Sequence, residues 1–487
     1  MTESAERPSP LSAAQLGFWY AQALAPGSRY DVVAEYLDIR GHVDPDLMQA
    51  ACCQAIDETN TLRSRIAADG PAPRQTLISR LDFEIPMVDL TGAADPEAEA
   101  HAWMQADARR PVDIRDFPLF RFALLRLGPR RHFWYQRFHH AAMDGYATTL
   151  FRDWLGVLYT ALANGTRPPE HDMVQLAELV AEEETYRASP AFADDRAYWQ
   201  ARFPDGITRT SLSAQPPTGP RQEFIREDGR LPRALLGELR AAARGMRTSW
   251  SAVLVAAVAV YTHALTGTEE FTLGLPVSGR RTPAARRGLA AMSNLLPLRM
   301  RVTPGATVAE LVRQATAEIR GALRHQRYRY EDLRRDLRAV DDTGLFGPFV
   351  NIINFATDPR FGEHTATTHV LTYGAVEDFS IAVCEWDDDS DFGFSVYANP
   401  ALHTPEEVRR HLDRLIQVIG RVAAAGHTAK VASIAVLTDR ELHEVPSLSA
   451  GAPSVGAPSV GGVSVGAPSV GGVSGGVASA GGVSGGG

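Results

Sequence analysis

The sequence is poor in the features that mark several common classes of protein. Its three cysteines, Cys52, Cys53 and Cys384, are too few and too irregularly spaced for a disulfide framework or a zinc site. The longest apolar run, residues 252–261, is shorter than the about 20 residues that a membrane-spanning helix needs. Residues 1–10 are polar and show no signal-peptide pattern. These absences predict a cytoplasmic protein that binds neither a metal nor a membrane.

Positive charge is also scarce. Lys430 is the only lysine, and 49 basic residues stand against 58 acidic ones, which leaves a formal net charge of -9. A protein that binds nucleic acid through phosphate contacts needs a dominant basic face, so the charge balance argues against nucleic acid as a partner. The hydrophobic share of 45% is ordinary for a globular protein. The 487 residues exceed the size of one compact core and suggest two lobes.

Helix-like and strand-like segments alternate over residues 12–445, as they do in α/β and α+β proteins. Apolar residues at helical spacing predict helices at 45–56, 148–163, 235–244, 251–266, 308–324 and 405–424. Short apolar or alternating segments predict strands at 118–127, 132–139, 271–275, 350–355 and 393–397. Between residues 188 and 221 the pattern breaks into polar, proline-containing segments, which we interpret as the crossing between the lobes. The predicted lobes cover residues 10–185 and 186–445.

The last segment, residues 446–487, has a different composition. It consists almost wholly of Gly, Ser, Val, Ala and Pro, and the sequence GAPSV recurs in it. Such a segment cannot bury enough apolar surface to offset the entropy of ordering it, so we expect a flexible linker or tail. A chain that stops inside a linker suggests a fragment of a larger protein, and a natural disordered tail is the alternative.

Residues 139–145, HHAAMDG, stand between a predicted strand and a predicted helix. A histidine whose backbone is fixed by a strand end can present its ring to a cleft and exchange a proton near pH 7. Asp144 can turn back and hold the local backbone, through a tight turn that Gly145 permits. Two histidines can also fall side by side at a strand end without any function, so the run by itself indicates only a candidate proton carrier.

Several further segments accompany this run along the chain. They are LSAAQLGFW (11–19), LRSR (62–65), YW (198–199), PVSGR (276–280), SNLLPLR (293–299), HQRY (325–328) and GPFVN (347–351). Taken in this order, they resemble the condensation domains of nonribosomal peptide synthetases over about residues 10–445. This family shares a fold with chloramphenicol acetyltransferase. The resemblance implies an α/β (α+β) protein with two such lobes in a V-shaped pseudo-dimer, each a mixed sheet flanked by helices.

Three segments resemble one subclass of that family. WYQR (134–137), RHQRY (324–328) and LFGP (345–348) are similar to the domains that open a synthetase subunit, as in the serine-loading subunit of enterobactin synthetase. Domains in this position take an aryl or fatty acyl group rather than a growing peptide. The resemblance therefore implies a role early in antibiotic or siderophore biosynthesis.

The activity implied by the resemblance is amide bond formation. The donor would be an aryl, fatty acyl or aminoacyl thioester, and the acceptor would be the amine of an aminoacyl thioester. Both would arrive on phosphopantetheine arms of carrier proteins, with no cofactor bound by the domain itself and with an adenylation domain downstream. Because a thioester is already activated, the enzyme needs only to align the reactants, move one proton and stabilise the oxyanion.

The resemblance also implies roles for the residues of the run. His140 would act as general base on the amine or would orient it through a hydrogen bond. The backbone N–H at Gly145 is a candidate oxyanion donor, because a glycine lets other atoms approach the backbone closely. His139 would pack behind His140 rather than react.

Further positions follow from the other segments. Asp144 would be structural and would pair with Arg280, with Arg281 as the rival partner. Ser293 and Asn351 would line the substrate cavity, or would bond the backbone at strand ends.

Alternatives remain open. Epimerization domains carry the same HHxxxDG pattern, whereas heterocyclization domains replace the histidines with aspartates. A non-catalytic domain that docks carrier proteins would lose His140 or Gly145, which are both present. A free-standing transferase of the same superfamily, using coenzyme A thioesters and forming amides or esters, is the remaining enzyme alternative.

Overall fold

The computed structural model describes most of the chain. The described residues are 8–24, 31–68, 72–207, 209–215, 224–337, 345, 347–355, 357–372, 374, 376–384 and 392–443. Residues 446–487, for which the sequence predicts a linker, lie outside the described residues. The chain divides into two compact units, Met1–Thr438 and Asp439–Gly487, and the fold and site below belong to the first unit.

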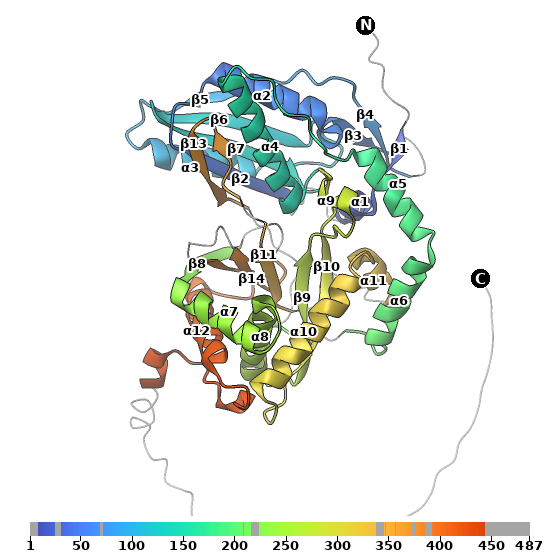
Figure 1. Ribbon diagram of the computed structural model, residues 1–487, viewed down its shortest axis with the longest axis vertical. Helices are drawn as coiled ribbons and strands as arrows, with labels where there is room; N and C mark the ends of the chain where they lie inside the picture. The colour runs from blue at the N-terminus through green and yellow to red at the C-terminus, as the bar shows by residue number, and fades with distance from the viewer. Residues whose placement is uncertain are drawn as a thin grey trace, which may run out of the picture. The chain divides into compact units, whose positions relative to one another are not determined.

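The first sheet is mixed and has six strands in the order β12-β13-β2-β7-β6-β5 (Figure 1). The strands are β12 (Arg360–Phe361), β13 (His364–Val370), β2 (Val32–Ile39), β7 (Arg131–His139), β6 (Phe120–Gly128) and β5 (Met87–Asp89). All pairs are antiparallel except β5 with β6. Alternate side chains pack against α2 (Pro45–Glu58) and α4 (Gly145–Ala163) on one face and against α3 (Pro96–Ala108) on the other.

The second sheet is also mixed, with six strands in the order β10-β9-β11-β14-β15-β8. The strands are β10 (Asn294–Arg301), β9 (Glu270–Val277), β11 (Phe349–Ile353), β14 (Phe379–Cys384), β15 (Phe392–Ala398) and β8 (Ile225–Leu231). Strand β11 runs parallel to both of its neighbours. The core of this sheet includes residues of α7 (Arg233–Gly245), α8 (Trp250–Thr266), α10 (Val308–Arg324) and α12 (Pro405–Ala424). Two mixed sheets flanked by helices confirm the predicted fold class.

Helix α8 shows how strongly local sequence defines an element here. It begins after Ser249, whose side chain accepts a hydrogen bond from the N–H of Ala252, and it ends at Gly267 in the left-handed conformation with φ of 68°. It is apolar all round because it lies inside the second core. Among the described residues no single helix is long and apolar enough to cross a membrane, although α7 and α8 together, bent by 102°, meet the length and composition criteria.

The smaller elements include a three-stranded sheet in the order β1-β4-β3 and several helices. They are β1 (Ser9–Pro10), α1 (Ala13–Leu24), β3 (Ser64–Ala67), β4 (Arg74–Leu77), α5 (Leu176–Arg187), α6 (Pro190–Arg202), α9 (Pro283–Arg286) and α11 (Tyr330–Asp336). Figure 1 shows α5 and α6 following one another along one side, from the first sheet to the second. These two helices carry the chain across between the two sheets.

Helix α6 lies in the segment that the sequence analysis interpreted as a break. The helix begins after Ser189 with Pro190 at its first position, where a proline costs no hydrogen bond. Only Asp195 and Trp199 are buried along it. Its apolar pattern is therefore too weak to register as a helix in the sequence. Trp199 packs in the second core.

Strands β12 and β13 cross back to the first sheet. Val370 of β13 pairs with Glu35 of β2, although both lobes had been expected to be continuous in sequence. Just beyond β13, Thr372 accepts a hydrogen bond at 2.8 Å from the N–H of Ala34, which is 338 residues away in the chain. The predicted lobe at 186–445 therefore contributes β12 and β13 to the first sheet. The local pattern could not show this, because the pairing partner of a strand is not encoded in its own periodicity.

Candidate active site

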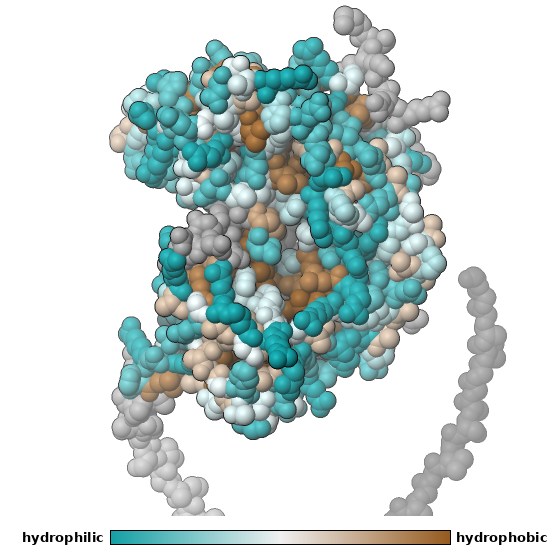
Figure 2. Space-filling view, in the orientation of Figure 1, coloured by the Kyte–Doolittle hydropathy of each residue, from teal (hydrophilic) through white to brown (hydrophobic). Residues whose placement is uncertain are grey.

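A cavity of about 500 Å³ lies between the two sheets. One wall is largely polar and comes from the first sheet and α4: Glu35, His140, Asp144, Gly145, Tyr146, Thr149, Arg152, Thr368 and Val370. The other wall, from the second sheet and its helices, has more apolar than polar residues. The apolar ones are Leu275, Pro276, Val277, Ile319, Leu323, Ile352, Ile353, Phe355 and Cys384, and the polar ones are Ser251, Ser278, Arg280, Ser293, Gln326, Asn351 and Asn354. Figure 2 shows a hollow between the two sheets where hydrophobic residues gather. The cavity can therefore hold a reacting polar group beside an apolar chain.

The HHAAMDG run forms the turn from β7 into α4. The N–H of His139 donates to the carbonyl of Leu119 at 2.8 Å, and the N–H of His140 donates to the carbonyl of Asp31 at 2.5 Å. The N–H of Ala142 then closes the turn on the carbonyl of His139 at 2.8 Å. These bonds fix the backbone on which both histidine rings are mounted.

His139 is a buried structural residue, with 1% of its surface exposed. Its Nδ1 accepts a hydrogen bond from the N–H of Ala141 at 3.0 Å. Burial, together with neighbouring His140, lowers the pKa of His139 to about 3, against the opposing effect of Asp113. His139 therefore stays neutral and supports the turn, and it is absent from the cavity wall.

His140 presents its ring to the cavity. The ring of Phe18 on α1 covers it with a centroid distance of 4.9 Å. Burial lowers the pKa of His140, and the charge of Arg329 lowers it as well, whereas Asp144 acts to raise it. Among the described residues no carboxylate bonds to this ring, and its Nδ1 is buried without a partner. The ring is therefore a neutral base at physiological pH, and it is not held as in a Ser-His-Asp triad.

Asp144 is fully occupied by structural hydrogen bonds. Its Oδ1 accepts from Ala147 and Arg280, and its Oδ2 accepts from Arg280 and from the N–H groups of Met292 and Ser293, at distances of 2.8–3.0 Å. Burial acts to raise the pKa of Asp144, but the charge of Arg280 and these bonds outweigh it and hold the pKa below its usual value. With both oxygens occupied, this carboxylate has no free lone pair directed at a substrate.

Arg280, rather than Arg281, is the arginine that pairs with Asp144. Its guanidinium spans both carboxylate oxygens at 2.8 and 3.0 Å and also donates to the carbonyls of Ser278 and Ala290. The side chains of the pair are 1% and 2% exposed. Arg281 instead donates to the carbonyl of Arg324. The pair joins α4 of the first lobe to the segment after β9 in the second.

Gly145 leaves open space beside its backbone, as the sequence analysis suggested for an oxyanion donor. It is the first residue of α4 and is absent from the positive-φ residues, so the turn needs no left-handed conformation there. A Cβ at this position would meet nothing within 4 Å, because the residue borders the cavity. The tight turn that the sequence analysis ascribed to Gly145 therefore uses no conformation reserved for glycine. The glycine keeps space open at a helix N-terminus, where the helix dipole favours a developing negative charge.

Ser293 and Asn351 both line the cavity from the second lobe. Ser293 lies directly before β10, and its backbone N–H donates to Asp144 at 2.8 Å. Asn351 lies on β11, where it pairs in register with Ala382 of β14. The structure thus brings both residues into the cavity that contains His140.

Sequence reasoning missed several residues around the cavity. Tyr146 stacks over Arg280, with 4.6 Å from the guanidinium carbon to the ring centroid. Glu35 and Arg152 form a buried ion pair at 3.0 Å in the polar wall. Arg152 could have been found, because it shares a helix face with Gly145 at helical spacing. Glu35 could not, because its partner is set by the tertiary fold.

A histidine base beside a helix N-terminus, facing an apolar wall in a cavity between two α/β lobes, has the composition of an acyl-transfer site. A family model described as Condensation domain matches residues 5–445. The chain therefore belongs to the condensation domain family of nonribosomal peptide synthetases, acyltransferases that form amide bonds between substrates carried on phosphopantetheine. The family predicted from the sequence is confirmed.

Relatives and solved structures agree with this assignment. The chain is 38% identical over 424 residues to the isonitrile lipopeptide synthase of Streptomyces coeruleorubidus, covering 85% of this chain and 28% of that protein. It is 30% identical over 420 residues to enterobactin synthase component F of Escherichia coli O157:H7, covering 85% and 32%. It matches the starter condensation domain of rhizomide synthetase RzmA, solved with C8-CoA and Leu-SNAC, with a TM-score of 0.82 and 36% identity, covering 88% of this chain and 98% of that one. The chain spans less than a third of the two synthases.

Proposed function

We propose that this chain is a starter-type condensation domain, which joins a fatty acyl thioester to the amine of an aminoacyl thioester. The observation that carries the proposal is the cavity, in which the His140 ring and the N-terminus of α4 face an apolar wall. The match to a starter condensation domain bound to C8-CoA and Leu-SNAC supports an acyl donor and an aminoacyl acceptor. The likeness to a lipopeptide synthase supports the fatty acyl class.

The proposed reaction uses few groups. The acceptor amine attacks the thioester carbonyl while His140 accepts one of its protons or orients it. The oxyanion forms beside the N–H of Gly145 at the start of α4. Attack forms the C–N bond. Collapse of this intermediate restores the carbonyl and breaks the C–S bond, and the proton passes to the leaving thiolate. Asp144 and Arg280 take no part in bond making, and they hold the turn that carries His140.

The proposal also concerns the surroundings of the domain. Carrier proteins would deliver the donor and the acceptor on opposite sides, and an adenylation domain would follow the predicted linker at 446–487. Ser293 and Asn351 would contact substrate within the cavity. The reducing cytoplasm suits free phosphopantetheine thiols and a chain with three cysteines.

The test is an amide-formation assay with the purified chain. A leucyl N-acetylcysteamine thioester is offered as acceptor, with an octanoyl, a benzoyl or an aminoacyl thioester as donor, and products are measured by mass spectrometry. We expect octanoyl amide, and we expect His140→Ala to lower its rate by about 10²–10⁴. His42, which is exposed and outside the cavity, provides the control variant His42→Ala with a native rate.

Other outcomes would decide between the alternatives. Preference for the benzoyl donor would replace the fatty acyl class with the aryl class, in line with the likeness to enterobactin synthase component F. An ester product with a hydroxyl acceptor would indicate an ester-forming transferase. No product with any donor, even when both substrates are loaded on carrier proteins, would leave a docking domain and contradict the catalytic proposal.

A further inference from the structure

The two-residue segment Met292–Ser293 is held from both sides. Its N–H groups donate to Oδ2 of Asp144, both at 2.8 Å. Its carbonyls accept from Nη1 of Arg329, at 3.2 Å for Met292 and 2.8 Å for Ser293. The backbone of a cavity residue, Ser293, is thus fixed between an anion of the first lobe and a cation of the second.

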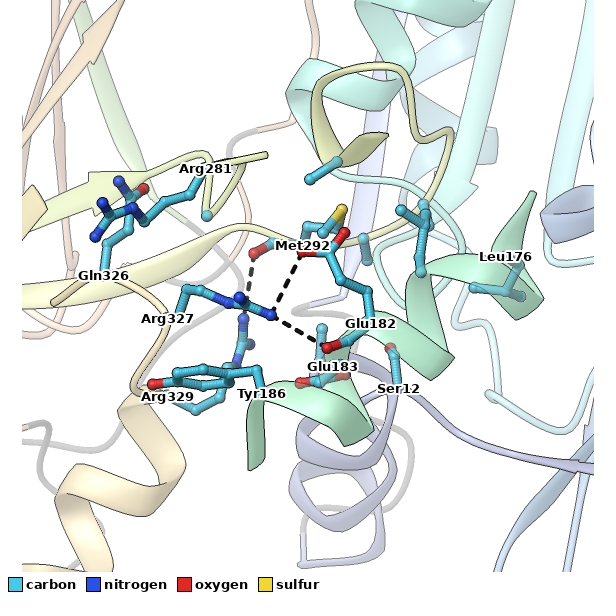
Figure 3. Close-up of a pocket in the computed structure, with 16 residues that line it drawn as sticks. Ser12, Leu176, Glu182, Glu183, Tyr186, Arg281, Met292, Gln326, Arg327 and Arg329 are labelled. Carbon is cyan, nitrogen blue, oxygen red and sulfur yellow. Dashed lines mark hydrogen bonds and ion pairs between the residues drawn. The ribbon is translucent and has the colours of Figure 1, made fainter. Parts of the chain in front are cut away.

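Arg329 lies behind the cavity rather than in it. It precedes α11, its side chain is 12% exposed, and it borders a separate, small cavity of about 60 Å³. Figure 3 shows this small cavity, with Arg329 and Arg327 side by side below Met292. Arg327 contacts Glu182 instead, through its carbonyl at 3.3 Å and its carboxylate at 3.5 Å. Arg329 is not among the residues that line the reaction cavity.

Arg329 is also connected to the helix that covers His140. Its Nε donates to Glu331 at 3.3 Å, and Glu331 lies against α1, where a Cβ on Gly17 would come within 2.6 Å of the Glu331 carboxylate. The next residue of α1 is Phe18, whose ring covers His140. The Arg329–Glu331 pair therefore supports the surface of α1 that sets the position of the His140 ring.

We propose that Arg329 is a positioning residue for the condensation reaction, which fixes the Met292–Ser293 backbone on one side of the cavity and α1 behind His140 on the other. The proposal rests on the proposed role of His140 and extends it to a residue that touches no substrate. Asp144 alone cannot hold Met292–Ser293 in one orientation, since its bonds reach only the N–H side. Arg329 supplies the bonds on the carbonyl side.

The charge of Arg329 gives the proposal a distinctive readout. The charged groups that act on His140 are Asp144, which raises its pKa, and Arg329, which lowers it together with burial. Removing the cation raises the pKa of His140, so on acidification the ring is protonated at a higher pH and is a neutral base only above that pH. The acid limb of the pH–rate profile then moves toward higher pH. Loosened packing that changes neither the burial of the ring nor the charge near it would lower the rate without moving that limb.

The experiment compares Arg329→Gln, Arg329→Lys and the control Arg327→Gln with the native chain in the octanoyl–leucyl assay. Steady-state kcat and KM are measured across pH. In parallel, the rate at which diethyl pyrocarbonate modifies His140 is followed by mass spectrometry, because only the neutral imidazole reacts. The second readout needs no turnover. Circular dichroism melts establish that each variant folds.

We expect Arg329→Gln to lower kcat about tenfold or more, as for loss of charged hydrogen bonds, and to shift both pH profiles upward. Arg329→Lys keeps the cation, so it should retain the native profiles and regain part of the rate, and Arg327→Gln should behave as native. Native kinetics and profiles in Arg329→Gln would overturn the inference. A reduced rate with unmoved profiles would assign Arg329 a purely structural role. A native chain without product, but with a shifted His140 modification profile in Arg329→Gln, would reject the proposed function and leave the placement of Arg329 intact.

Discussion

The polar residues of the HHAAMDG run differ in what surrounds them. His139 is enclosed and bonded to Ala141, whereas His140 faces the cavity with Phe18 above it. Both carboxylate oxygens of Asp144 accept hydrogen bonds from α4 or from the second lobe. Of these residues, His140 is therefore the one that we propose to exchange a proton with a substrate. His139 and His140 are the same type of residue but differ in role, because their burial and their hydrogen-bond partners differ.

Replacing Gly145 with alanine tests whether the residue leaves space for the substrate or is needed for folding. The new Cβ meets no protein atom within 4 Å and strains no backbone, so Gly145→Ala should fold normally, with a melting temperature at or slightly above the native one. The methyl group would stand where the oxyanion is expected, so we expect kcat of the octanoyl–leucyl reaction to fall by about 10²-fold. A variant with native kcat would contradict the assigned oxyanion position.

Removing Arg280 leaves the buried carboxylate of Asp144 without its cation. We expect Arg280→Met to lower the free energy of unfolding by about 3–5 kcal/mol at pH 7, measured by urea denaturation. The double variant Asp144→Asn, Arg280→Met should lose less than the sum of the single variants, since no unpaired charge remains. Simple additivity would show that the two residues do not interact in solution.

The same pair sets a pH dependence. The pKa of Asp144 is depressed in the folded state, so its stabilising contribution is complete above its unfolded pKa of about 3.9 and is lost as pH falls toward the folded value. The stability difference between the native chain and Arg280→Met should therefore shrink as the pH is lowered below about 4. A difference that stays constant down to pH 3 would contradict the depressed pKa.

At the scale of elements, β12 packs closely on α4. The carbonyl oxygen of Arg360 lies 2.5 Å from the position that a Cβ on Gly156 would take. Thr160, one turn further along α4, accepts from the N–H of Gly362 at 2.9 Å. The crossing strands are therefore held to α4 by backbone atoms, which cannot move aside as a flexible side chain can.

This contact predicts opposite effects for two glycines in helices. Gly156→Ala should lower the free energy of unfolding by about 1–3 kcal/mol, because the methyl group collides with backbone. Gly237 on α7 is exposed, and a Cβ there would have no atom within 4 Å. Gly237→Ala should therefore raise the free energy of unfolding by up to about 1 kcal/mol. Urea denaturation of both variants checks the pair. Equal effects would mean that the β12 contact is not formed.

At the scale of the whole molecule, the predicted linker should contribute nothing to the stability of the lobes. Deleting residues 447–487 should leave the melting temperature nearly unchanged, because their composition offers little apolar surface to bury. As a control, a deletion from residue 404 also removes α12, whose buried residues include Leu412, Leu415 and Val418, and should prevent folding. A large drop on removal of the tail alone would show that it packs on the lobes.

Much of the secondary structure could be predicted because its signals are local. The helices predicted at 308–324 and 405–424 have those bounds, and each begins with a capping box, Thr307 with Glu310 and Thr404 with Glu407. Helix α6 could not be predicted, because its few buried residues make no stripe.

The sequence by itself determined the family, the two-sheet α/β class and the histidine run at a strand end, since periodicity, caps and short motifs act between near neighbours. Only the tertiary structure decided which arginine meets Asp144, that β12 and β13 join the first sheet, that Glu35 and Arg152 line the cavity, and that Arg329 bonds to the Met292–Ser293 backbone behind it. These are contacts between segments far apart in the chain. Their geometry depends on how two cores pack against one another, and no local pattern records it.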